Sequence, residues 1–60
     1  MKKAIFLLQN DKKSYKIILK NNEQKDYWDF INGKILIDYQ LQAVKNDLKK
    51  DGYKIEIKAI

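Results

Sequence analysis

The sequence contains no cysteine, histidine, threonine, proline or arginine, and it has only two glycines. Without cysteine and histidine, the chain can form neither a disulfide nor the zinc sites that these residues build. The same absence excludes nucleophile systems of the Cys–His and Ser–His–Asp types. Ser14 is the only aliphatic hydroxyl, and neither glycine lies in a phosphate-binding loop motif. We therefore expect a protein that is not an enzyme, with no catalytic residue, no metal and no cofactor.

Because the chain lacks arginine, all of its positive side-chain charge comes from lysine. All 13 basic residues are lysines, and the formal net charge is +5. Lysine is a mobile point charge, whereas arginine supplies the planar fork that binds phosphate or guanine through two hydrogen bonds. An AT-rich coding sequence produces the same bias towards lysine, asparagine and isoleucine. The lysine count alone is therefore poor evidence for a nucleic-acid partner.

The chain also lacks the long apolar runs of exported and membrane proteins. The apolar run at residues 4–8 follows Met1, Lys2 and Lys3 but is shorter than the roughly 7–15 residues of a signal peptide. No run approaches the roughly 18 residues of a membrane span. We expect a soluble cytoplasmic protein that does not bind membranes.

Sixty residues predict one small domain, covering residues 1–60. A chain of this length buries only about 60% of its unfolded surface and gains little stability from its core. No disulfide or metal can add to that stability here. Good packing or self-association must therefore supply it, and a homodimer is one expectation.

The first third of the chain predicts a β-hairpin. Residues 2–9 are apolar on both faces, which is typical of a central strand. Residues 14–20 alternate between apolar and polar side chains, as a half-buried strand does. The polar residues 10–13 are turn formers that would connect the two strands.

The aromatic stretch at residues 27–39 allows two interpretations. Asn32 and Gly33 form a pair that favours a type I′ hairpin turn. That hairpin would gather one apolar face, made of Trp28, Phe30, Ile35, Ile37 and Tyr39. The alternative is a short helix over residues 23–32, followed by a separate strand at residues 35–37. We prefer the hairpin, because it accounts for both flanks of the turn.

The last third predicts a helix and a strand. Ile37, Leu41, Val44 and Leu48 recur at helical spacing, which indicates a helix over residues 39–51 with Asp38 as its N-cap. Gly52 suits the end of that helix. Residues 53–60 then alternate strictly, as a strand does.

These elements predict an α+β fold with a small, mostly antiparallel sheet. The element order is β-β-β-β-α-β, or β-β-α-β-α-β if residues 23–32 are helical. A single C-terminal helix, at about residues 39–51, would pack on one face of the sheet. The order of the strands does not follow from the sequence.

One helix leaves the other face of the sheet uncovered. That face would carry aliphatic residues rimmed by lysine, and such patches usually mark an interface. Aromatic residues, at 12% of the chain, add to this indication because tyrosine and tryptophan often anchor interfaces. The candidate protein-interface residues are Ile5, Leu7, Ile18, Tyr27 and Ile60.

The same face suggests a second kind of partner. Lys16, Lys20, Lys54 and Lys58 would lie together there and could bind nucleic acid, with Tyr27 available to stack on a base. Acidic residues are interspersed with the lysines, and no dense basic run appears. The simpler interpretation is a solvated sheet face that discourages aggregation.

We therefore expect a non-catalytic regulatory or inhibitory protein that acts by binding another protein. Small single-domain proteins of this size and composition are often of this type, including those that phages and mobile elements encode. This is an association from size and composition. A small basic nucleic-acid-binding domain is the alternative.

Overall fold

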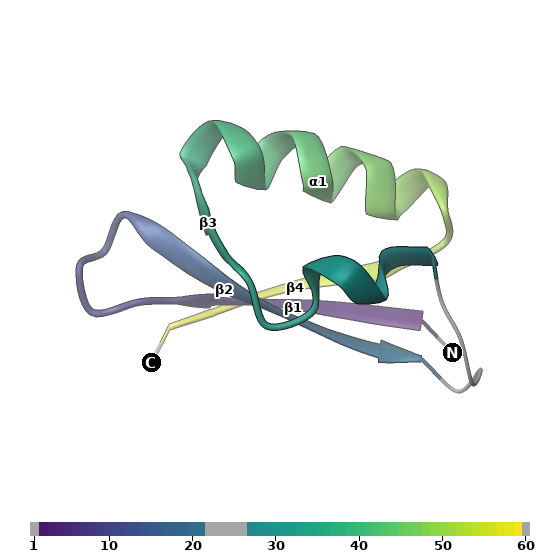
Figure 1. The fold of residues 1–60 in the computed structure, drawn as a ribbon, viewed down its shortest axis with the longest axis horizontal. Coiled ribbons are helices and arrows are strands. Elements are labelled where there is room, and N and C mark those ends of the chain that lie inside the picture. The colour runs from purple at the N-terminus through teal and green to yellow at the C-terminus, as the bar shows by residue number, and fades with distance from the viewer. Residues whose placement is uncertain (1, 22–26, 60) are drawn as a thin grey trace.

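The computed structural model describes residues 2–21 and 27–59 as a four-stranded sheet with one α-helix and one short 3-10 helix. In chain order the elements are β1 (Lys2–Leu8), β2 (Ser14–Asn21), η1 (Tyr27–Ile31), β3 (Ile35–Ile37), α1 (Asp38–Lys50) and β4 (Lys54–Ala59). Helix α1 lies across one face of the sheet, and no described element covers the other face (Figure 1). The predicted α+β class is confirmed.

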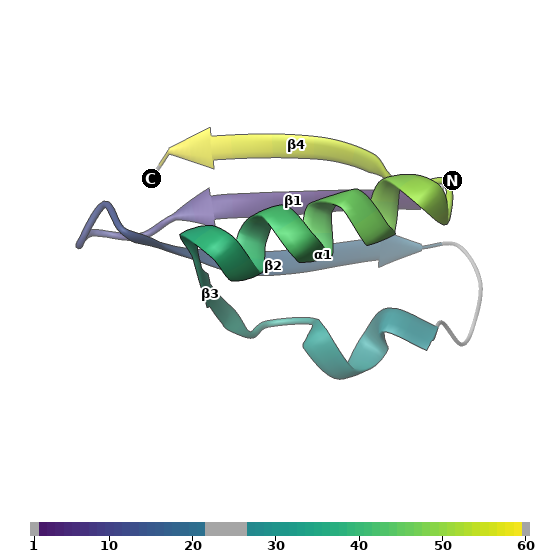
Figure 2. The same ribbon diagram turned by 90° about the horizontal axis from the view of Figure 1, so that it is seen from above.

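The strands follow the order β3-β2-β1-β4, with β1 and β2 in the middle. Strands β1 and β2 pair antiparallel, as do β2 and β3, whereas β1 and β4 pair parallel. The sheet is therefore mixed. The parallel pair arises because α1 carries the chain from β3, at one edge, over the sheet to β4 at the other edge (Figure 2).

The predicted hairpin of β1 and β2 is confirmed, as is the central position of β1. Asp11 organises its turn: Oδ1 accepts hydrogen bonds from the backbone N–H groups of Lys13 and Ser14, at 2.9 and 3.0 Å. The Ser14 hydroxyl donates to the same carboxylate at 2.8 Å. These donors, led by the Lys13 N–H, lower the pKa of Asp11. Ser14 is therefore a turn residue at the start of a strand.

The predicted hairpin over residues 27–39 is wrong. Gly33 has a positive φ of 83°, but Asn32 does not share the positive φ that a type I′ turn needs at both central residues. The alternative interpretation agrees in part, because Tyr27–Ile31 forms a 3-10 helix. Residues 23–26, the first part of the proposed helix, lie outside the described residues.

The wrong hairpin also assigned the wrong face to β3. Leu36 is buried opposite Tyr15, while Ile35 and Ile37 are 52% and 44% exposed. The predicted hairpin places Ile35 opposite Phe30 and Ile37 opposite Trp28, all on the apolar face. Pairing with β2 reverses that assignment, because a strand's side chains alternate between faces and the register fixes which set points inward.

Helix α1 confirms the predicted helix to within one residue at each end, but β4 follows it, so it lies mid-chain rather than at the C-terminus. The predicted N-cap, Asp38, is instead the first helical residue, and Ile37 occupies the cap position. The Gln40 side chain accepts a hydrogen bond from the Ile37 N–H at 3.2 Å, which satisfies one donor at the helix start. Gly52, with φ of 89°, ends the helix as predicted.

The core lies between α1 and the face of the sheet beneath it (Figure 1). Its buried members come from β1, β2, η1, β3 and α1 and from the residue before β4: Ala4, Phe6, Ile17, Ile31, Leu36, Leu41, Leu48 and Tyr53. The last strand runs from Lys54 to Ala59, with Tyr53 in the core just before it. Ile60, the predicted end of that strand, lies outside the described residues.

Candidate functional site

The face of the sheet turned away from α1, here called the open face, carries two rows of lysine. In the first row, Lys3 of β1 stands directly between Lys20 of β2 and Lys54 of β4. In the second row, Lys16 and Lys58 flank Leu7 of β1. The rows are four residues apart along β1, which is about 13 Å at the rise of a strand. The structure thus brings together all four lysines predicted from the sequence.

Lys3 is a member of this group that the sequence analysis missed. Its position became evident only from the register, which sets it opposite two other lysines. Like charges directly opposite one another in a sheet are destabilising. Three lysines abreast are therefore an arrangement that a counter-charge would relieve.

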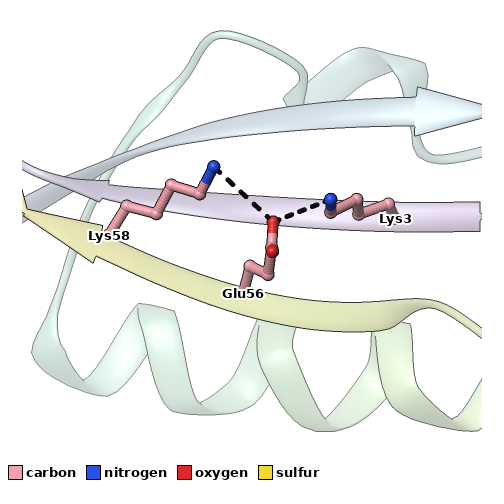
Figure 3. Close-up of polar contacts among 3 residues, drawn as sticks. All are labelled: Lys3, Glu56 and Lys58. Atoms are coloured by element: carbon pink, nitrogen blue, oxygen red, sulfur yellow. Dashed lines mark ion pairs between the residues drawn. The ribbon is translucent and has the colours of Figure 1, made fainter.

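Glu56 supplies part of that counter-charge at the centre of the open face. Its Oε2 atom lies 3.0 Å from the Lys3 ammonium and 3.9 Å from that of Lys58 (Figure 3). The Lys3 ammonium is the main cause that lowers the pKa of Glu56, and Lys58 and Lys54 lower it further. Five lysines and one glutamate leave the open face with a charge of +4.

Aliphatic side chains lie among the lysines of the open face. Ile5 and Ile18 are opposite each other, and Leu7 lies two residues further along β1. Ile5 is only 7% exposed, while Leu7 and Ile18 are half-buried. The exposed Ile35 extends this strip, because it pairs with Lys16. The candidates Ile5, Leu7 and Ile18 therefore lie together on the open face, and Ile35 adds the most accessible apolar surface.

Tyr27 does not lie with them. It belongs to η1, which runs beside β2 (Figure 2), and its side chain is 77% exposed. Its ring meets Trp28 edge-on, with centroids 5.2 Å apart, and Phe30 at 5.7 Å. Tyr27 is therefore not placed to stack on a base bound between the lysine rows. The remaining candidate, Ile60, lies outside the described residues.

No catalytic constellation is visible in the described part of the chain. A pocket of about 160 Å³ lies where β1 and β4 end, lined by Leu8, Gln9, Asn10, Lys12 and Ala59. Ligand pockets usually measure about 300 Å³ or more. Within residues 2–21 and 27–59, acidic side chains do not gather in groups of three that could hold a metal ion.

Comparison of the chain with protein-family models, curated proteins and solved structures gave no match. Helix α1 is too short and too polar to cross a membrane, and the described residues hold no other helix that could do so.

Proposed function

We propose that this protein is a non-catalytic regulatory or inhibitory protein, and that its open face binds an acidic surface of a protein partner. The observation that carries the proposal is the pattern of that face. Ile5 and Ile18 lie between the two lysine rows, Leu7 and Ile35 lie within the second row, and the described residues of the face carry a charge of +4. An apolar centre within a charged rim is the usual plan of a protein interface. A cytoplasmic location for this encounter is part of the proposal.

The same charge argues against two copies meeting through their open faces. A face-to-face pair would bring five lysines against five lysines, with only Glu56 of each copy as counter-charge. Like-charge contacts across an interface cost binding energy and suppress wrong partners. A partner with acidic residues around an apolar patch would complement both features of the face.

Nucleic acid is the second candidate, favoured by the spread of the lysines over three neighbouring strands. Phosphate contacts by lysine need no sequence recognition, and such binding falls steeply with added salt. The described part of the open face, however, presents aliphatic rather than aromatic side chains, and base stacking normally uses aromatic ones. This difference makes a protein partner the leading proposal.

The first test is the fluorescence anisotropy of mixed-sequence single-stranded and duplex oligonucleotides titrated with the protein at low and physiological salt. We expect no binding at physiological salt, because the face lacks arginine and aromatic side chains. Micromolar binding at physiological salt would favour the nucleic-acid alternative over the protein-partner proposal.

The second test uses a photo-crosslinking residue at Ile35, which is exposed on the open face, and at Asn46, which is exposed on α1. In extracts of the source cells, we expect a defined protein adduct from position 35 that position 46 does not give. Changing Lys16, Lys20, Lys54 and Lys58 to Glu should abolish it. Identical adducts from both positions would contradict the proposal.

A matched control distinguishes the loss of the open-face lysines from the general effect of a changed net charge. Four Lys→Glu changes take the chain from +5 to −3 wherever they are made. The control set lies in the β1–β2 turn and at the end of α1, and consists of Lys12, Lys13, Lys49 and Lys50. The adduct should persist in this control. Loss of the adduct in both variants would show that general charge, rather than the open face, drives the interaction.

A further inference from the structure

The outer edge of β4 has no strand partner. Strand β4 is last in the sheet, and within residues 2–21 and 27–59 it pairs on one side only, with β1. Figure 2 shows it as the outermost strand, with no described element beyond it. Ile57, near its middle, is 56% exposed although it lies on the face that carries α1. An uncovered edge of this kind is a template for another strand.

We propose that β4 pairs with β4 of a second copy, antiparallel across a two-fold axis that passes beside Ile57. The ladder would join residues 55–59 of each copy and unite two four-stranded sheets into one of eight strands. This inference concerns the edge of the sheet and does not depend on the function proposed for the open face.

The charges on β4 select this register. In an antiparallel pair, directly opposite residues share a face and interact most strongly. A two-fold axis at Ile57 sets Glu56 opposite Lys58 of the second copy, and Lys58 opposite its Glu56. An axis at Glu56 would instead set glutamate against glutamate and Lys54 against Lys58. An axis at Lys58 would set lysine against lysine.

An axis at Ile55 would also match charges, since Lys54 would then face Glu56. Two observations disfavour it. Ile55 is half-buried and packs against the core, so it has less surface to offer than Ile57. That register would also extend the ladder to Tyr53 and Gly52, and Gly52 has the positive φ of 89° that ends the helix. The axis at Ile57 uses only residues that are already extended.

Glu56 has the capacity for the added contact. Both of its ion pairs within the chain use Oε2, with Lys3 and with Lys58. Lys58 remains 53% exposed in its side chain. Oε1 is therefore the oxygen to which Lys58 of the second copy would bind.

The symmetry has a structural consequence. A two-fold axis perpendicular to the sheet keeps both α1 helices on one side and both open faces on the other. The two basic faces would become continuous, and the exposed Ile57 side chains would meet between the helices. The contact is a single strand pair with a small area, so it belongs with weak and transient interfaces.

The association itself is tested by sedimentation equilibrium from the low micromolar range to about 1 mM, the range of weak contacts. We expect the average mass to rise towards that of a dimer. Lys58→Glu and Glu56→Lys should each stay monomeric, because each sets like charges opposite one another. Mixed together, the two variants should associate, because every opposed pair then has opposite charges.

A change in net charge alone cannot explain why each variant stays monomeric while the mixture associates. Lys58→Glu lowers the charge from +5 to +3, so general repulsion between its copies is smaller than in the natural chain. Stronger self-association of this variant would overturn the register. A natural chain that keeps the monomer mass up to about 1 mM would overturn the dimer itself.

A cysteine scan locates the axis, because the chain has no cysteine of its own. Opposite residues have Cβ atoms about 4.5–5.5 Å apart, close to the reach of a disulfide. Ile57→Cys should form an intermolecular disulfide at least about tenfold faster than Ile55→Cys or the exposed control Tyr39→Cys. Equal rates at all three positions would overturn the proposed axis, whether or not the charge variants fold well.

Discussion

The outer backbone edge of β2 is hydrogen-bonded to other parts of the chain, whereas the outer edge of β4 has no partner among the described residues. Strand β3 covers the start of β2, from Ser14 to Lys16. Beyond it, Ile17 donates to the Lys34 carbonyl at 3.0 Å and accepts from the Gly33 N–H at 2.7 Å. The Asn32 side chain then accepts the Leu19 N–H at 3.0 Å. Three residues of β3, the backbone of Gly33 and Lys34, and the side chain of Asn32 thus close most of an eight-residue edge.

The two edges of this 60-residue protein are protected from strand addition in different ways. The β2 edge is protected by the chain itself, and η1 then packs beside it through the buried Ile31. The β4 edge relies on Lys54, Glu56 and Lys58, whose charges discourage pairing in the registers centred on Glu56 and on Lys58. Covered backbone prevents strand addition, whereas charged side chains still allow the registers in which opposite charges face one another.

The largest expected effect is on the free energy of unfolding, when an apolar side chain is removed beside each edge. Ile31→Ala should lower the free energy of unfolding by about 2–3 kcal/mol, because it empties a buried site that holds η1 against the core. Ile57→Ala should change it by less than about 0.5 kcal/mol at micromolar concentration, because that side chain is exposed. Urea denaturation followed by circular dichroism measures both. A loss for Ile31→Ala as small as that expected for Ile57→Ala would show that η1 does not stabilise its edge.

A smaller effect is expected from the amide that closes the β2 edge. Asn32→Ala removes the acceptor of the Leu19 N–H and should cost about 1 kcal/mol. Asn32→Asp is the matched variant, since it keeps an oxygen at the same position and should lose less. Hydrogen exchange of the Leu19 amide gives a local readout and should accelerate in the alanine variant. An unchanged exchange rate would mean that this hydrogen bond does not protect the edge.

The smallest effect concerns the ion pair that links β4 to β1. Lys3 lowers the pKa of Glu56 below its ordinary value of 4.5, so the folded state favours the charged carboxylate. This contribution is fully present above the ordinary pKa and is lost as the pH falls through the lower, folded pKa. The stability difference between the natural chain and Glu56→Gln should therefore be constant near neutral pH and shrink below about pH 4.5.

Lys3→Met provides the control for that pH dependence. Without the ammonium, the pKa of Glu56 measured by NMR should rise towards its ordinary value, while the pKa of Asp11 stays low. Asp11 is held by the N–H groups and hydroxyl of its own turn and not by Lys3. A Glu56 pKa that does not respond to Lys3→Met would show that the ion pair does not persist in solution.

Regular elements of this fold were predictable because their signals are local. The alternation in residues 14–20 and 53–60 and the helical spacing of Leu41, Val44 and Leu48 each lie within one element. The failure came at residues 27–39, where Asn32 and Gly33 resemble a hairpin turn. There the amide of Asn32 bonds to β2, which lies far away in sequence, and that contact is invisible in the local pattern.

The candidate site was predictable to the same extent. An uncovered sheet face could be predicted because the sequence contains one long helix, which covers only one side of a sheet. Side-chain alternation within a strand then places Lys16 with Lys20, and Lys54 with Lys58, on the same face. Lys3 and Ile35 were missed, because their membership depends on which strands are neighbours and in which register. Tyr27 was assigned to the open face because the hairpin made it a strand residue.

The sequence by itself determined the α+β class, the two strands of the first hairpin, the helix and the final strand. It did so because side-chain periodicity reports the local backbone geometry directly. Only the tertiary structure decided that β4 pairs parallel with β1 at an open edge, that three lysines stand abreast, and that Glu56 lies among them. Those features depend on contacts between distant segments, which no local pattern encodes.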